Sequence, residues 1–147
     1  MVPPDTLQKL IDMARRRSDL AARSLGASHT REREEESKLQ LLIEYRLDYL
    51  RRYQHTARYS GLNAHQLANY QDFLRKLDTA IEQQQAVVMQ SHSKVEQDRG
   101  DWRAANRKEK SFDTLSRRNE EEERVRANRR EQREQDDLVL ARIISGN

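Results

Sequence analysis

The sequence predicts an all-α protein, a long antiparallel two-helix coiled coil (a helical hairpin), on three observations. Its 147 residues are 36% charged and 5% aromatic, with four Gly and two Pro, which leaves too little apolar material for a layered core. Apolar residues recur every seven positions along the second half of the chain. A glycine-bearing turn near residue 61 separates the two halves. Long helices that bury a narrow seam account for all three observations.

The turn is predicted at about residues 60–63. Gly61 can adopt the left-handed conformation that ends a helix, and Leu62 supplies an apolar contact just beyond it. Asn63, with Gln66 three residues later, has the pattern of a capping box for a second helix. A tight reversal here would make the two helices antiparallel. Two residues would then lie opposite each other when their numbers sum to roughly 122, a relation that we call the register sum.

The first helix is expected over about residues 4–59, with Pro3 and Pro4 at its leading edge. From His29 to Lys38 the seam fades into charged residues, so this section is predicted to be the least stable part of the helix. Before it, apolar and small residues alternate at intervals of four and three, the 3.5-residue repeat of a coiled-coil seam. These residues are Leu7, Ile11, Ala14, Ser18, Ala21, Leu25 and Ser28.

The second helix is expected over about residues 64–143, so that residues 1–147 form a single coiled-coil hairpin. Because the first helix begins near Pro4, it cannot pair beyond about Arg118, which leaves about residues 119–147 as an overhanging C-terminal helix without a partner in the chain. One seam set repeats strictly at sevens, which implies a left-handed supercoil: Leu67, Leu74, Ile81, Val88, Val95 and Trp102. The other is polar in its middle: Tyr70, Leu77, Gln84, Ser91, Asp98, Ala105 and Phe112.

Apolar surface is in excess near the turn, because each helix carries a second apolar stripe beside its seam. The register sum brings the two extra stripes together as one patch along a single side of the hairpin. Partly exposed Tyr and Phe suit a protein interface, whereas the alternative is that the stripes only broaden a thin core, and for Leu42 and Leu77 both interpretations stay open. The patch comprises Leu42, Tyr45, Tyr49, Phe73, Leu77 and Ala80, with Lys38 and Gln84 beyond.

Motifs for catalysis are absent from the sequence. It has no cysteine, phosphate-binding loop, nucleophile motif or metal-ligand spacing, so no enzyme, cofactor or metal site is predicted. Only His55 and His65 are expected to approach each other, across the turn, as a solvent-facing pair. No apolar run could span a bilayer and no secretion signal is evident, so a soluble, cytoplasmic protein is expected.

Two aromatic-bearing stretches resemble the flagellar export protein FliJ family. They are Lys38–Tyr45 with Tyr49, and Asn69–Ile81 followed by Trp102. The resemblance implies a non-enzymatic component of the bacterial flagellar type III export apparatus, serving flagellum biogenesis, motility and chemotaxis. It also implies a long coiled coil similar to the γ-subunit stalk of rotary ATPases, monomeric when free and peripheral to the inner-membrane apparatus.

The same resemblance implies partners. Members of the family insert into the ring of the export ATPase FliI, engage the export-gate membrane protein FlhA and bind export chaperones, with no nucleic acid or small-molecule substrate. The family's gate-binding surface maps onto the patch defined above, and relatives can carry Gln and His at the positions of Lys38 and Gln84. The ends of the coiled coil would face the ATPase, including these residues of the tail: Arg124, Arg126, Leu138, Leu140 and Ile143.

The alternatives are a nucleic-acid-binding coiled coil and a generic coiled-coil scaffold. Twelve Lys and Arg lie in the segment Arg99–Glu134, but nine Asp and Glu share it. A phosphate-binding surface needs basic side chains segregated on one face, so this mixture argues against nucleic acid.

Overall fold

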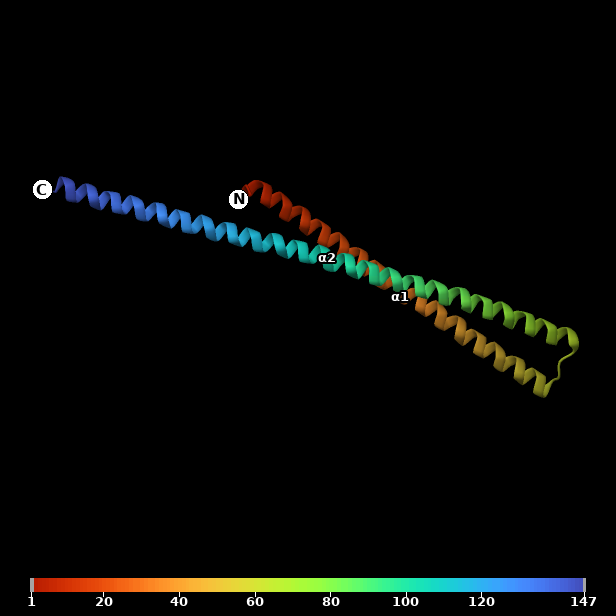
Figure 1. The fold of residues 1–147 in the computed structure, drawn as a ribbon. Helices are drawn as coiled ribbons and strands as arrows, with labels where there is room; N and C mark the ends of the chain where they lie inside the picture. The colour runs from red at the N-terminus through yellow and green to blue at the C-terminus, as the bar shows by residue number, and fades with distance from the viewer. Residues whose placement is uncertain (1, 147) are drawn as a thin grey trace. The chain divides into compact units, whose positions relative to one another are not determined.

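The computed structural model describes residues 2–146, which form two helices (Figure 1). Helix α1 spans Pro4–Tyr59 and helix α2 spans Ala64–Ser145, two residues beyond the expected end. The described residues contain no strand. The two helices pack against each other in opposite directions, which confirms the predicted all-α helical hairpin.

Two compact units divide the chain. One is Leu20–Trp102, which contains the turn, and the other combines Met1–Asp19 with Arg103–Asn147. Both units receive one segment from α1 and one from α2. Each unit thus pairs its own two segments.

The turn has the local chemistry that its sequence predicts. Gly61 adopts a φ of 71°, in the left-handed region that favours glycine. The Asn63 side chain accepts a hydrogen bond from the Gln66 backbone N–H at 2.8 Å, and the Gln66 side chain accepts one from the Asn63 N–H at 3.1 Å. These reciprocal bonds form a capping box that satisfies N–H groups at the start of α2, so the predicted cap is confirmed.

The seam of α2 in the unit Leu20–Trp102 follows the two predicted heptad sets. Every one of these seam positions is buried or half-buried, the polar ones included. Leu77, Ser91, Val95 and Asp98 are the buried residues of α2. The seven-residue spacing therefore predicted the buried side of α2 even where the side chains are polar.

The buried side of α1 continues after Ser28, although the apolar repeat fades into charged residues as the sequence indicated; that this section is the least stable of the helix stays a prediction. The alternation of four and three continues to the end of the helix, with positions that are all buried or half-buried: Glu32, Glu35, Leu39, Leu42, Arg46, Tyr49, Tyr53 and Thr56. Three of these positions carry charged side chains, so the apolar pattern weakens although the seam continues. A hydrophobic periodicity cannot reveal a seam whose members are ionic.

Partners on α2 explain how charged residues occupy the seam. The Gln84 amide donates a hydrogen bond to the Glu35 carboxylate at 2.7 Å, and Arg46 donates one to Asp78 at 2.6 Å. The bond from Gln84 is the main cause that lowers the pKa of Glu35. Each charged seam residue is thus paired across the helices, as buried charges require.

A second polar contact lies at Asp98, whose side chain is buried. Ser28 donates a hydrogen bond to its carboxylate, and Lys94 forms an ion pair with it at 3.1 Å. The bond from Ser28, followed by that from Lys94, lowers the pKa of Asp98. The register sum of roughly 122 places Ser28 opposite Lys94. The hydrogen bond of Ser28 is instead to Asp98, one helical turn further along α2.

In the other unit, Leu7, Ile11, Ala14 and Ser18 of α1 are buried, as the seam pattern predicted. Arg15 and Asp113 form an ion pair of 3.7 Å between the two helices. α2 then continues past the start of α1, and each described residue from 120 to 146 is exposed. This part of α2 is the overhanging C-terminal helix that the sequence predicted (Figure 1).

Candidate functional site

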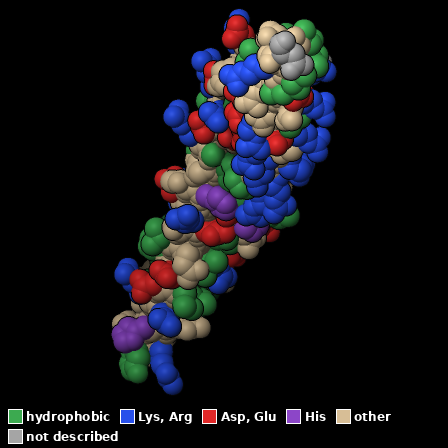
Figure 2. Space-filling model, turned by 90° about the vertical axis from the view of Figure 1, so that its left-hand side faces the viewer, with side chains coloured by type: hydrophobic (Ala, Val, Ile, Leu, Met, Phe, Trp, Pro, Cys, Tyr) green, Lys and Arg blue, Asp and Glu red, His purple; other side chains and the backbone are tan. Residues whose placement is uncertain are grey.

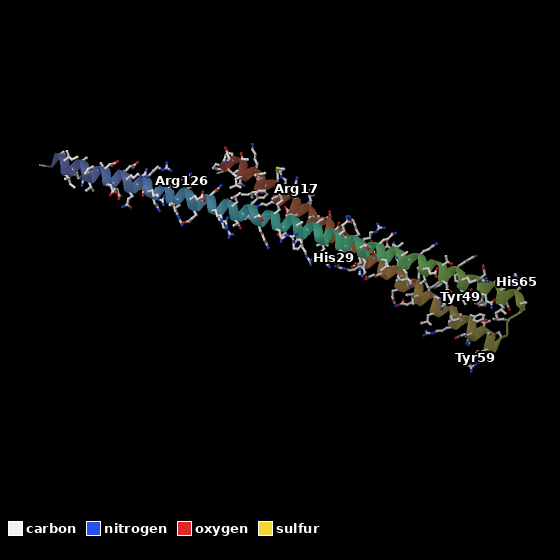
Figure 3. All side chains as sticks on the ribbon, viewed as in Figure 1. Arg17, His29, Tyr49, Tyr59, His65 and Arg126 are labelled. Carbon is white, nitrogen blue, oxygen red and sulfur yellow. The ribbon has the colours of Figure 1, made fainter. Side chains whose placement is uncertain are left out.

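An aromatic cluster joins the two helices near the turn. We use this name for Tyr45, Tyr49 and Tyr53 of α1 with Tyr70 and Phe73 of α2. Ring centroids are 4.4 Å apart for Tyr49 and Phe73, 5.2 Å for Tyr49 and Tyr70, and 5.3 Å for Tyr53 and Tyr70. Tyr45 meets Phe73 edge-on at 6.1 Å. Figure 3 labels Tyr49 on the part of α1 that approaches the turn.

The helical repeat determines which of these rings are covered. Tyr49, Tyr53 and Tyr70 occupy seam positions and are half-buried. Phe73 lies beside the seam and is also half-buried, whereas Tyr45 keeps 48% of its surface exposed. Burial, and then the neighbouring Tyr70 and Tyr45, raises the pKa of the Tyr49 hydroxyl. The centre of the cluster is therefore neutral, and its edge is open to solvent at Tyr45.

The remaining residues of the predicted patch divide between core and rim. Leu77 is buried, with 7% exposure, and Leu42 and Ala80 are half-buried. Lys38 is exposed, and its amino group lies 3.4 Å from the Glu35 carboxylate that also accepts the Gln84 bond. The structure thus brings Lys38 and Gln84 together at one carboxylate, next to the apolar residues.

Further exposed apolar residues of α1 were not assigned to the patch from the sequence. Leu41 is 65% exposed and lies one helical turn from Tyr45, so both side chains share a face. Ile43 and Leu47, at 41% and 47% exposure, occupy a different face. The signal for Leu41 was its four-residue spacing from Tyr45.

The overhanging part of α2 carries the other predicted site residues. Leu138, Leu140 and Ile143 have exposures of 63%, 56% and 63%, and no described segment covers them. Arg124 forms an ion pair with Glu121, and Arg126 forms one with Glu123 at 3.5 Å. Figure 2 shows many Lys and Arg side chains gathered along one side of the upper half of the visible face, with Asp, Glu and hydrophobic side chains beside them.

A cluster that the sequence reasoning missed lies in the middle of the unit Leu20–Trp102. His92 Nδ1 contacts one carboxylate oxygen of Glu32, and His29 Nδ1 lies 3.9 Å from the other. Its contact with Glu32 is the main cause that raises the pKa of His92, and Glu36 contributes in the same direction. His29 is labelled in Figure 3.

The expectation that only His55 and His65 could approach each other was therefore wrong. His29 and His92 come together on Glu32, and the ring of His55 lies 4.7 Å from that of Tyr59. The spacing of histidines along each helix does not reveal this contact, because it depends on the register between the two helices. That register pairs the positions of His29 and His92.

Within residues 2–146, neither helix contains a stretch apolar enough, over a sufficient length, to cross a membrane.

Comparison with known proteins gives consistent matches. A family model described as "Flagellar FliJ protein" matches residues 4–147. The chain is 30% identical over 139 residues to the flagellar FliJ protein of Salmonella typhi, and 28% identical over 139 residues to that of Escherichia coli (strain K12). Both alignments cover 95% of this chain and 94% of the relative.

Proposed function

Because the chain belongs to the FliJ family of flagellar proteins, we propose that it is a non-enzymatic, stalk-like adaptor of the flagellar type III export apparatus. Its role in flagellar export follows from the family. Its proposed partners are the export ATPase ring FliI, the export gate FlhA and export chaperones. We place it in the cytoplasm, peripheral to the inner-membrane apparatus and monomeric when free.

The observation that carries the gate-binding assignment is the half-exposed ring of Tyr45. Tyr45 contacts Phe73 edge-on, and Phe73 lies against Tyr49, so an exposed ring is held by side chains of both helices. An aromatic side chain that is already fixed loses little conformational entropy when a partner covers it. Rigid aromatic anchors of this kind dominate binding energy at protein interfaces.

The neighbouring residues support an interface in different ways. Leu77 is buried and Leu42 is half-buried, so both belong to the apolar core of the patch rather than to its exposed surface. Lys38 and Gln84 contribute polar groups that are already bonded to Glu35. An apolar centre with a bonded polar border is the common composition of protein interfaces.

The ATPase-binding assignment draws on the exposed end of α2. Leu138, Leu140 and Ile143 leave more than half of their surface in solvent, and Val139 and Ile144 do the same at 54% and 75%. Clustered apolar exposure of this kind marks contact sites in soluble proteins. Arg124 and Arg126 lie more than three helical turns earlier in the same helix, where they would add a separate, polar contact with the ATPase.

The gate-binding assignment is tested by measuring the affinity of the soluble part of the gate protein for Tyr45→Ala and for Tyr45→Ala with Phe73→Ala. We expect the double variant to bind at least about tenfold more weakly, with helicity unchanged by circular dichroism. Tyr59→Ala is the matched control, since Tyr59 is a tyrosine of α1 that is 72% exposed and belongs to no predicted site. Unchanged affinity in the double variant would rule out the patch as the gate-binding surface.

A further inference from the structure

Two carboxylates of α1 and an imidazole of α2 converge within the unit Leu20–Trp102. One ligand atom from each of Glu32, Glu36 and His92 lies within 4.8 Å of the other two. Glu32 and Glu36 are one helical turn apart and share a face, while His92 reaches them from the opposite helix. We propose that Glu32, Glu36 and His92 form a binding site for a divalent transition-metal ion such as zinc, which links α1 to α2.

The donor set fits this class of ion. Zinc binds imidazole nitrogen and carboxylate oxygen at about 2.0–2.2 Å and usually takes four ligands in a tetrahedron. His29 is a candidate for a fourth ligand after a small side-chain movement, because its Nδ1 lies 3.9 Å from Glu32 and its side chain is half-buried. A mixed nitrogen and oxygen set favours zinc over calcium or magnesium, which prefer oxygen alone.

Packing holds the central ligand in place. Glu32 occupies a seam position of α1, and its side chain is only 14% exposed. Its two carboxylate oxygens face different histidines, so the carboxylate is already oriented toward nitrogen donors of both helices. Glu36 and His92 are exposed, which leaves the site open to an ion from solvent.

The surrounding charge also favours a cation. A surface hollow beside the cluster is lined by Glu32, His92, Ser93, Val95, Glu96 and Arg99. Arg99 is the basic side chain of this lining, and it donates a hydrogen bond to Glu96 at 2.6 Å. The lining of this hollow therefore holds two carboxylates and one arginine, and that arginine already has an anionic partner.

A metal ion bound at this site would stabilise the pairing of the two helices where the α1 seam carries charged residues. Glu32 and Glu35 replace apolar side chains at two successive seam positions, so hydrophobic burial contributes little at this level. An ion held by ligands from both helices binds the folded state and not the unfolded one. Mass action then stabilises the pairing of α1 with α2.

The test uses the full chain after treatment with a chelator. Calorimetric titration with zinc should give one ion per chain, and zinc should raise the unfolding temperature in a way that EDTA reverses. Glu36→Gln and His92→Ala should each weaken zinc binding at least about tenfold and remove the temperature shift. Glu36 is exposed and the Gln side chain has the same shape, so Glu36→Gln tests the ligand without disturbing the fold.

His65→Ala is the matched control, because His65 lies at the exposed start of α2, away from the cluster, and its loss should leave zinc binding unchanged. Equal zinc affinity in the wild type, Glu36→Gln and His92→Ala would overturn the site. Zinc binding without any rise in unfolding temperature would overturn the link between helices. Neither measurement uses the gate or the ATPase, so the result is independent of the export partners.

Discussion

The rings of Tyr49 and Phe73 lie 4.4 Å apart between centroids, with their planes inclined by 47°. Tyr49 occupies the α1 seam, and Phe73 lies at the edge of the α2 seam, where it also contacts the half-exposed Tyr45. Phe73 therefore connects Tyr49 in the core with Tyr45 on the surface that we propose binds the export gate. Because packing and recognition share these rings, their contributions have to be measured separately.

A double-mutant cycle with Tyr49→Leu and Phe73→Leu separates the ring contact from burial. Tilted aromatic pairs contribute about 0.5–1.5 kcal/mol beyond the area they bury, so we expect a coupling free energy of about 1 kcal/mol in urea unfolding. The control cycle combines Tyr59→Leu with Phe73→Leu and should show no coupling, since Tyr59 is highly exposed. A coupling near zero for Tyr49 with Phe73 would mean that the rings contribute through burial alone.

Leu77 tests the division of the patch into core and surface. Leu77→Ala removes a buried side chain of the seam and should lower the free energy of unfolding by about 2 kcal/mol or more. Leu41→Ala, at a site that is 65% exposed, should change it by less than about 0.5 kcal/mol. If the two variants were equally stable, Leu77 would not belong to the packed core of the patch as we describe.

The fold of α2 and of the turn could be predicted because their signals are local or strictly periodic. Gly61 and Asn63 determine the turn through backbone conformation and a short-range cap, and neither depends on the rest of the chain. The seven-residue spacing also identified Asp98 as a seam position despite its charge. Patterns that depend on spacing alone remain visible when a polar residue interrupts them.

The polar half of the α1 seam could not be predicted in the same way. Glu35 and Arg46 look like solvent-exposed residues unless their partners Gln84 and Asp78 are known to face them from α2. The cluster around Glu32 has the same origin, since its histidines come from both helices. Such contacts depend on which residues of α2 lie opposite α1. The sequence of one helix alone does not give this pairing.

Replacement of glycine by alanine is expected to have opposite effects on stability at Gly61 and at Gly100. Gly61→Ala should destabilise the hairpin by about 1 kcal/mol, because an alanine at φ 71° is strained although its added Cβ would meet no atom within 4 Å. Gly100→Ala lies within α2 and is equally unobstructed, so it should stabilise by about 1 kcal/mol. Thermal unfolding of the two variants gives the comparison. A gain of stability at Gly61 would show that the turn can adopt another conformation.

The buried carboxylate of Asp98 predicts a loss of stability in acid. Hydrogen bonds from Ser28 and Lys94 lower its pKa in the folded chain below the ordinary value of 3.8. Its contribution is therefore complete above pH 3.8 and is lost as the pH falls through the lower native value, where the carboxylate becomes protonated. Asp98→Asn should weaken this acid dependence, whereas Asp101→Asn, at an exposed site on the same helix, should retain it. Identical pH profiles for the wild type and Asp98→Asn would contradict the assignment.

Removal of residues 119–147 distinguishes the two proposed ends of the protein. Each described residue from 120 to 146 is exposed, so the shortened chain should keep its helical pairing and lose little stability in thermal unfolding. We expect binding to the export ATPase to fall much more than binding to the gate, because the aromatic cluster lies in the unit Leu20–Trp102. A larger loss of gate binding would reverse the assignment of the two ends.

A smaller change locates the ATPase contact within this tail. Replacing Leu138, Leu140 and Ile143 together by Ser removes three of the five exposed apolar side chains at this end of α2 while keeping its length. If apolar contact drives the interaction, these substitutions should weaken ATPase binding by about as much as the truncation does. Arg124→Gln with Arg126→Gln should instead reduce the salt dependence of binding with a smaller loss of affinity, since both arginines are exposed. Full ATPase binding by the triple Ser variant would move the contact away from the C-terminal cluster, toward the arginine-bearing part of the helix.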